Sequence, residues 1–188
     1  MYLPLLLREV DRINKIIEGL LYFSRPCQTV PIPVDLHRVI QDTMMLIRNR
    51  AEHQGISFTV NLPDDLPQLQ LDEEQYKQVF LNLFLNSVQA MEEAGVIGVY
   101  GRYLPAEDAV EVCVVDTGPG IPDQLKHKVF DPFFTTKKTG TGLGLAVVHR
   151  LVTAQGGRIS LEDNPDGGAV VRIVIPRVRK ENRENAER

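Results

Sequence analysis

The segment from Asp72 to about Ala94 constrains the fold of this chain most, because it predicts a helix that is apolar on almost every side. Its hydrophobic residues are Val79, Phe80, Leu81, Leu83, Phe84, Leu85, Val88 and Met91. A helix with apolar residues all round lies buried inside a domain. Asp72, followed three residues later by Gln75, resembles a capping box and marks the start of the helix.

One narrow stripe of this helix is polar. Gln78, Asn82, Asn86 and Gln89 follow at spacings of four, four and three residues, which places them on one face. Two interpretations are open. On a half-exposed helix the stripe faces water. On a buried helix it forms the wall of a polar cavity, since unpaired buried amides cost about 1–3 kcal/mol each and amide oxygens suit a hard cation such as Mg²⁺.

The surrounding sequence predicts a domain of mixed helices and strands. A helix over 35–53 is expected to begin at the N-cap Asp35 and to end before Gly55, and a second helix is expected over 143–155. Strands are expected at 56–62, 96–104, 109–116, 157–163 and 169–176. The strands at 96–104 and 109–116 are close enough in sequence to form a hairpin.

The N-terminal residues 1–26 are expected to form a separate unit. Apolar residues alternate at gaps of three and four over 2–25: Leu3, Leu6, Val10, Ile13, Ile17 and Leu20. Such a narrow seam predicts a helix that pairs with a partner helix. Prolines predict an extended linker over 27–34, and the charged residues 178–188 are expected to be a disordered tail. The main domain is therefore expected over 35–177.

Composition excludes several functional classes. The net charge of −4 and the pI near 5.6 argue against nucleic-acid binding by bulk electrostatics, and no apolar run approaches the roughly 20 residues that span a bilayer. Cys27 and Cys113 lie far apart, as expected for structural thiols in a reduced, cytoplasmic setting. The four histidines show neither metal-ligand spacing nor a catalytic-triad arrangement.

A turn directly after the strand at 109–116 carries the first candidate ligand contact. Asp116 ends the strand, and Gly118 and Gly120 allow the backbone to turn sharply beneath a ligand. The carboxylate could accept a hydrogen bond from an exocyclic amine such as that of adenine. Taken alone, the same pattern is also that of a simple tight turn.

The next stretch, of roughly 25 residues, is too long for a simple connection within a compact domain. Phe130, Phe133 and Phe134 either pin it to the domain as a small apolar cluster or anchor a lid. It ends in three alternate glycines at 140, 142 and 144, where a helix begins, and the free N–H groups of a helix start favour phosphate. The spacing matches neither a P-loop nor a dinucleotide fingerprint.

Together and in this order, these segments resemble the ATP-binding region of sensor histidine kinases, closest to the nitrogen-regulation type. "QVFLNLFLNSVQAM" (78–91) is similar to the N box, and "DTGPGI" (116–121) to the first glycine box. "FDPFF" (130–134) is similar to the F box, and "TGTGLGL" (139–145) to the second glycine box. "REVDRINKIIEGLLYFSRP" (8–26) resembles the second helix of the dimerisation and phosphotransfer hairpin.

The resemblance implies an α+β two-layer sandwich, with helices on one face of a mixed sheet, and ATP and Mg²⁺ as cofactors. Asn86 would bind Mg²⁺ with help from Asn82, Asp116 would bind the adenine amine, and 122–142 would be a lid anchored by Phe130. Asn82, Asn86 and Lys137 would be the catalytic residues. The implied ATP-binding set is Asn82, Asn86, Gln89, Asp116, Gly118, Gly120, Ile121, Phe130, Lys137, Gly140, Thr141, Gly142, Leu143 and Gly144.

The resemblance further implies transfer of the ATP γ-phosphoryl group to a histidine rather than hydrolysis. Gyrase, MutL and the heat-shock chaperones place a glutamate four residues before the Mg²⁺-binding asparagine. Here that position is Asn82, and an amide cannot act as a general base. The alternatives are an anti-sigma-type serine kinase and a non-enzymatic, ATP-gated interaction module.

None of the four histidines lies in the phosphoacceptor context of the family, an H-E/D-x-x-N/T-P-like segment. The chain is therefore expected to be a fragment that binds ATP without phosphorylating itself. The resemblance implies a homodimer through the helix at 2–25 and a response-regulator receiver domain as partner. Nucleic acid is not expected as a partner, and any membrane anchor of the parent protein would lie upstream of this chain.

Overall fold

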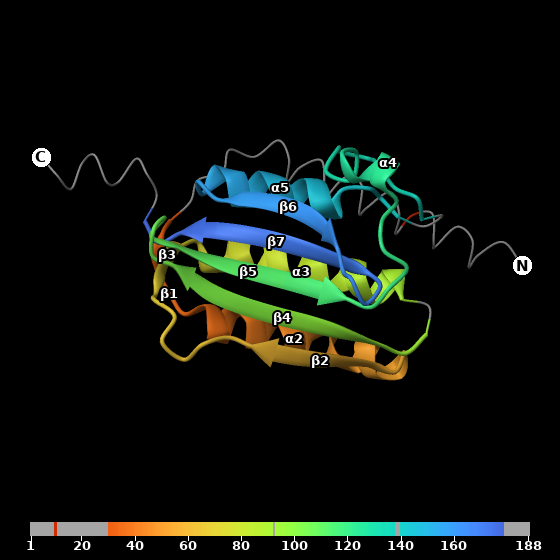
Figure 1. Cartoon of the computed structure of the whole chain (residues 1–188), viewed down its shortest axis with the longest axis horizontal. Helices are drawn as coiled ribbons and strands as arrows, with labels where there is room; N and C mark the ends of the chain where they lie inside the picture. Colours follow the sequence, from red (N-terminus) through yellow and green to blue (C-terminus); the bar gives the residue numbers. More distant parts are fainter. Residues whose placement is uncertain (1–9, 11–29, 92, 138–139, 179–188) are drawn as a thin grey trace, which may run out of the picture.

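The computed structural model describes residue 10 and residues 30–91, 93–137 and 140–178. The expected helix at 2–25 and the expected tail lie outside the described residues, except for Val10 and Val178. The main domain has two layers, with helices α2, α3 and α5 covering one face of a five-stranded sheet (Figure 1). This arrangement confirms the α+β two-layer sandwich implied by the sequence.

The main sheet has the strand order β2-β4-β5-β7-β6. Its strands are β2 (Ile56–Asn61), β4 (Gly95–Leu104), β5 (Ala109–Asp116), β6 (Arg158–Asp163) and β7 (Ala169–Pro176). Only β2 and β4 pair in parallel; the other neighbours are antiparallel, including the expected β4–β5 hairpin. Each strand lies within one or two residues of its predicted range.

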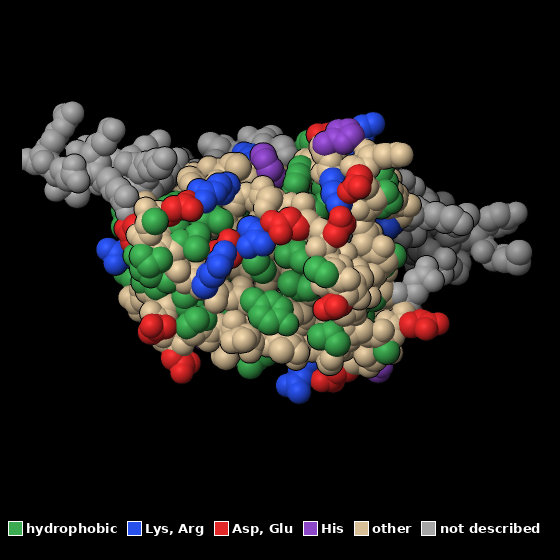
Figure 2. Space-filling model, viewed as in Figure 1, with side chains coloured by type: hydrophobic (Ala, Val, Ile, Leu, Met, Phe, Trp, Pro, Cys, Tyr) green, Lys and Arg blue, Asp and Glu red, His purple; other side chains and the backbone are tan. Residues whose placement is uncertain are grey.

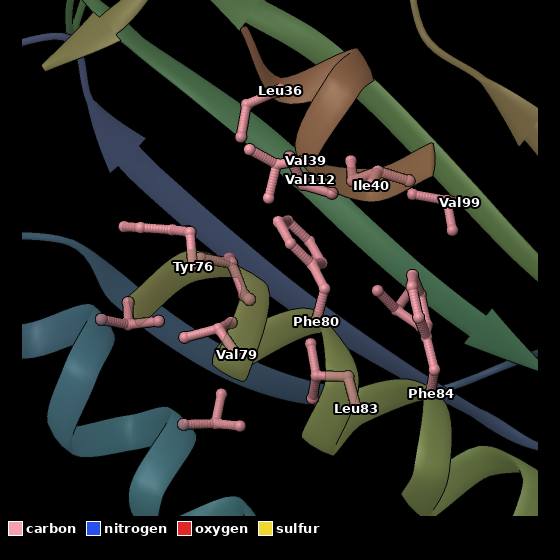
Figure 3. Packing of buried hydrophobic residues seen from close by; sticks show 14 of the residues in the cluster. Leu36, Val39, Ile40, Tyr76, Val79, Phe80, Leu83, Phe84, Val99 and Val112 are labelled. Carbon is pink, nitrogen blue, oxygen red and sulfur yellow. The ribbon is translucent and has the colours of Figure 1, made fainter. Parts of the chain in front are cut away.

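The helix layer is built around α3 (Glu73–Ala90), which lies between α2 (Leu36–His53) and α5 (Gly144–Ala154). Asp72 caps α3, since its carboxylate accepts a hydrogen bond from Gln75 N at 3.1 Å, as predicted. Phe80 points from α3 toward Val39 of α2 and Val112 of the sheet (Figure 3). Tyr76, Phe80 and Phe84 are fully buried, which confirms that this helix forms the centre of the core.

The predicted end of this helix, near Ala94, is wrong. The helix stops at Ala90, because Met91 takes an extended conformation (φ −90°, ψ 113°) and its side chain is 4% exposed. A Cβ added at Gly95 would lie 2.4 Å from Met91 Sδ, so the methionine occupies the space beside the start of β4. Burial of Met91 overrides the helix propensity of the residues that follow it.

A small second sheet was not predicted. Strand β1 (Ile32–Val34) pairs in antiparallel fashion with β3 (Leu69–Leu71). Val34, Leu69 and Leu71 are buried in the main core. Residues that the sequence analysis places in an extended linker therefore pack on the domain, and the proline at 33 is accommodated in a short edge strand.

The face of the sheet opposite the helices carries a row of ion pairs across four strands (Figure 2). Glu111 on β5 accepts from Arg102 Nε on β4 at 2.7 Å and from Arg172 Nη1 on β7 at 2.8 Å. Arg172 also pairs with Glu162 on β6 through its Nε at 2.7 Å. Burial of Glu111 would raise its pKa, but the two arginine hydrogen bonds outweigh burial and hold the pKa below its ordinary value.

None of the helices within the described residues is long and apolar enough to span a membrane.

Replacing Glu111 by Gln is expected to lower the free energy of unfolding by about 1–2 kcal/mol at pH 7, because it leaves two arginines without a buried carboxylate. A carboxyl with a depressed folded-state pKa stabilises the fold above its unfolded pKa of about 4.3 and loses this contribution as the pH falls through its folded pKa. The difference between wild type and E111Q should therefore shrink at pH 3, as measured by urea denaturation.

The matched control is Glu162→Gln, which removes an exposed carboxylate bonded to Arg172 alone. Its loss of stability should be smaller than that of E111Q. Equal losses for the two variants would contradict a central role for Glu111.

Candidate functional site

The polar stripe of α3 faces away from the sheet and meets the start of α5. The Nδ2 atoms of Asn82 and Asn86 are both buried and form no hydrogen bond within the described residues. Gly144, the first residue of α5, lies directly against them: a Cβ added there would be 3.3 Å from Asn86 Nδ2 and 3.7 Å from Asn82 Oδ1. The structure therefore favours the cavity-wall interpretation of the stripe over a face turned to bulk water, because buried donors without partners are costly.

Lys137 reaches this stripe from the long connection between β5 and α5. Its ammonium group donates to the backbone oxygen of Asn86 at 3.3 Å and to Gln89 Oε1 at 3.4 Å. The pKa of Lys137 is lowered, chiefly because the ammonium group is partly buried; the charge of Asp116 opposes this effect and that of Arg50 adds to it. A cation held beside two unsatisfied amide donors makes this end of α3 a candidate site for an anion.

Asp116 is fixed at the end of β5 by donors from three parts of the chain. Its Oδ1 accepts from the backbone N–H groups of Gly118 and Ala169, each at 3.1 Å. Its Oδ2 accepts from Ser87 Oγ of α3 at 3.0 Å. The carboxylate is thus held in one orientation beside the asparagine stripe, and Oδ2 retains a lone pair for a further donor.

The hairpin between β6 and β7 closes over the turn that follows Asp116. Asn164 Nδ2 donates to the backbone oxygen of Asp116 at 3.1 Å. A Cβ added at Gly120 would lie 3.1 Å from the backbone oxygen of Gly168. A Cβ added at Gly168 would lie only 1.9 Å from the backbone oxygen of Asp116, so the two loops touch through their backbones.

The lid predicted over 122–142 is attached to the domain at several points. It contains the short helix α4 (Asp123–Lys126), whose Lys126 pairs with Asp163 of β6 at 2.5 Å. Phe130 packs against the His149 ring of α5, with ring centres 5.5 Å apart, in agreement with an anchoring role. Phe133 is 54% exposed, so the three phenylalanines do not all share one apolar cluster.

The remaining predicted site residues lie at the end of this connection. Phe133 N donates to the backbone oxygen of Gly142 at 2.9 Å. A Cβ added at Gly140 would lie 2.4 Å from Thr135 Oγ1. Leu143 is buried at the start of α5, and Ile121 and Thr141 are half-buried. The structure therefore gathers Asn82, Asn86, Gln89, Lys137 and Gly144 around the stripe, and Gly118 around Asp116.

Four residues of the site were missed by the sequence analysis: Ser87, Asn164, Gly168 and Ala169. Ser87 directly follows Asn86, but the sequence does not show that this serine is buried and bonded to Asp116. Asn164 and Gly168 belong to a loop whose Pro and Gly residues predict only a turn. The hydrogen bonds from Asn164 and Ala169 to Asp116 span about fifty residues of sequence and depend on strand pairing.

A second depression, of about 320 Å³, lies on the open face of the sheet and is lined by Arg102, Arg158, Arg172, Glu107 and Glu111. Each of its arginines pairs with a glutamate, so their charges are neutralised within the fold. Within the described residues, no three His, Cys, Asp or Glu side chains gather as a metal site. The asparagine stripe with Asp116 is therefore the better candidate site.

Gly168→Ala is expected to destabilise the domain by about 3 kcal/mol or more, because its φ of +101° disfavours a side chain and the new Cβ would collide with the Asp116 backbone. Thermal and urea unfolding measure this loss.

Gly167 supplies a matched control. Its φ is +95°, yet a Cβ added there meets nothing within 4 Å. Gly167→Ala should lose only about 1 kcal/mol, the conformational part of the effect. Similar losses for the two variants would mean that the contact between the loops is unimportant.

The family model described as histidine kinase-, DNA gyrase B- and HSP90-like ATPase matches residues 71–179. Signal transduction histidine-protein kinase AtoS from Escherichia coli (strain K12) is 38% identical over 176 residues, which cover 93% of this chain and 29% of AtoS. The chain thus spans less than a third of the length of that relative.

Two solved structures share the fold. The nucleotide-free catalytic domain of histidine kinase ThkA has a TM-score of 0.74 and 31% identity, over 81% of this chain and 99% of that domain. Histidine kinase ThkA in complex with response regulator protein TrrA has a TM-score of 0.81 and 27% identity, over 96% and 52% of the respective chains. This chain therefore belongs to the histidine kinase-, DNA gyrase B- and HSP90-like ATPase family, as a catalytic domain of the histidine kinase type.

Proposed function

We propose that this chain is the ATP-binding catalytic region of a sensor histidine kinase, which transfers the ATP γ-phosphoryl group to a histidine on another polypeptide segment. One arrangement carries the proposal: the Asp116 carboxylate accepts from Ser87 of α3, which directly follows Asn86, so it lies near the orphaned Asn82 and Asn86 amides. A base-reading carboxylate at the end of β5 and a phosphate-binding surface on the adjoining part of α3 suit a nucleotide that lies across the end of this helix.

Asp116 would select the base. An ionised carboxylate only accepts hydrogen bonds, so its free lone pair on Oδ2 suits the exocyclic amine of adenine. The oxo group at the same position of guanine would face the carboxylate without a proton to donate. Gly118 and Gly120 leave room for the base and sugar, because neither carries a side chain in the turn that follows Asp116.

The stripe would hold the phosphates. The orphaned Asn82 and Asn86 Nδ2 groups and the Lys137 ammonium group would donate to phosphate oxygens. The N–H groups at the start of α5, which begins at Gly144, face the same region and favour negative charge. Gln89, which accepts from Lys137 at 3.4 Å, would keep the lysine in place.

The donor set also fits a magnesium ion held partly by the nucleotide. Each asparagine amide brings one hard oxygen acceptor beside its orphaned donor, and Asn86 is the ligand that we assign. Mg²⁺, when bound, supplies charge neutralisation at the phosphates.

Phosphoryl transfer suits this site better than hydrolysis. The amide of Asn82 cannot take a proton from water, so water in the site would lack activation from this position. Catalysis would rest on the alignment of the γ-phosphate and on charge stabilisation by Lys137 and the amide donors. The acceptor histidine would come from a dimerisation hairpin, to which the helix at 2–25 would contribute.

The proposed downstream partner is the receiver domain of a response regulator. The solved complex of ThkA with TrrA supports this partner by analogy. Dimerisation through the helix at 2–25, the parent protein's membrane anchor and the domain boundaries at 26, 34 and 177 belong to the same proposal.

Asp116→Asn is expected to weaken ATP binding at least about tenfold, because a neutral amide replaces the charged acceptor of the adenine amine and hydrogen bonds to charged groups are worth about 1.5–3 kcal/mol. The variant should also lose its preference for ATP over GTP. Isothermal titration with each nucleotide in the presence of Mg²⁺ measures both effects.

Asp42→Asn serves as control, since Asp42 is an exposed carboxylate of α2 paired only loosely with Arg38 at 3.9 Å. Its ATP affinity should match that of wild type. An Asp116→Asn variant that remains folded and binds ATP normally would remove the basis of the proposed base recognition.

The purified chain is expected to bind ATP without becoming labelled by γ-³²P-ATP, because none of its histidines has the phosphoacceptor context. Acid-labile label should appear instead on an added hairpin protein that carries such a histidine. Stable label on this chain alone would contradict the expectation. Asn86→Ala removes the assigned magnesium ligand, so this variant should not transfer label to the hairpin.

A further inference from the structure

Helices α2 and α3 pack against each other in the helix layer. Near the helix starts, Arg38 of α2 pairs with Glu73 of α3 at 3.2 Å. Beyond the helix ends, Gly55 approaches Ala94, where an added Cβ would lie 3.2 Å from the alanine Cβ. The two helices therefore run in the same direction. Arg50, about three turns after Arg38, is level with the end of α3 that carries Asn86 and Gln89.

Arg50 also lies on the side of α2 that faces α3. It follows Thr43 by two helical turns and so shares its flank, and Thr43 is fully buried. The opposite flank faces the sheet edge, since His37 Nε2 is 3.3 Å from the Leu62 backbone oxygen just beyond β2. The Arg50 side chain therefore extends from α2 on the side of the polar stripe, and it is exposed to solvent.

Arg50 is close enough to Lys137 for the two charges to interact. Besides burial, which is the main cause, the positive charge of Arg50 contributes to the lowered pKa of Lys137. Two cations from different elements thus lie near one end of the stripe, which carries the buried amide donors of Asn82 and Asn86. Like charges repel, so a polyanion bound between them would remove an unfavourable interaction.

Arg50 differs from the other arginines of α2. Arg38 pairs with Glu73, and Arg48 pairs with Glu52 at 2.7 Å. Across the described part of the chain, no carboxylate lies within ion-pair distance of Arg50. The arginines of the open sheet face are also paired. Among the residues that the structure describes, Arg50 is thus a cation without a carboxylate partner beside the proposed phosphate-binding surface.

We propose that Arg50 is a further phosphate-binding residue of the ATP site, supplied by α2, outside the four motifs that resemble the kinase boxes. With Lys137 it would contact the terminal phosphates, where a planar guanidinium group can donate two parallel hydrogen bonds to phosphate oxygens. The inference rests on the proposed function, because it assigns a residue to the same nucleotide site.

The test compares Arg50→Ala with Arg48→Ala, two substitutions of α2 arginines that lie two residues apart. Titration calorimetry with ATP, ADP and adenosine in the presence of Mg²⁺ gives the affinities. For Arg50→Ala we expect about a tenfold loss for ATP, a smaller loss for ADP and no change for adenosine, since only the phosphates reach the guanidinium. Arg48→Ala should bind all three ligands like wild type, and Arg50→Lys should recover part of the ATP affinity.

Inorganic tripolyphosphate is a second probe, because it carries the phosphates without a base. It should raise the melting temperature of wild type more than that of Arg50→Ala. Unchanged ATP affinity in Arg50→Ala would overturn the inference, and so would an equal loss for ATP and adenosine. Failure of the wild-type chain to bind any adenine nucleotide would instead overturn the proposed function itself.

Discussion

The packing of α3 against the sheet is the contact on which the rest of the structure depends. Tyr76, Phe80 and Phe84 anchor one side of this helix in the core, with Phe58 of β2 packed edge-on against Phe84 at 5.6 Å. That anchoring fixes the rotation of α3 about its axis. Because rotation is fixed, the asparagines on the outward side meet Gly144 of α5, while Ser87 reaches Asp116. Core packing and the geometry of the candidate site are thus set by one helix.

Much of the fold followed from local sequence patterns, because strands and helices here keep the periodicities that burial on one face requires. The stripe of Asn82 and Asn86 could be predicted from the sequence for the same reason. The end of α3 could not be predicted, because the residues after Met91 have good helix propensity and only the packing of Met91 beside Gly95 ends the helix. The pairing of β1 with β3 could not be predicted either, because three-residue strands are too short to show a clear alternation of apolar and polar residues.

The candidate site was predictable where one element carries the signal and unpredictable where two elements must meet. Asp116 could be recognised from the strand and the glycines around it. Its partners Ser87 and Ala169 could not, because their role arises when α3 and β7 pack against the end of β5. Arg50 belongs to the same class: its helix shows an ordinary amphipathic pattern, and only the parallel course of α2 and α3 brings it to the stripe.

The hydrogen bonds that hold Asp116 have a consequence for the stage of synthesis at which the candidate site is completed. Two of its donors, Asn164 and Ala169, lie 48 and 53 residues beyond Asp116. A nascent chain that has folded α3 and β5 still lacks Ala169, whose N–H donates to the carboxylate, and Asn164, which donates to the Asp116 backbone oxygen. The set of hydrogen bonds around Asp116 is complete only after the final hairpin has emerged and paired. If Asp116 binds the base as proposed, nucleotide should stabilise finished domains more than their truncated precursors, which would couple ligand occupancy to completion of the chain.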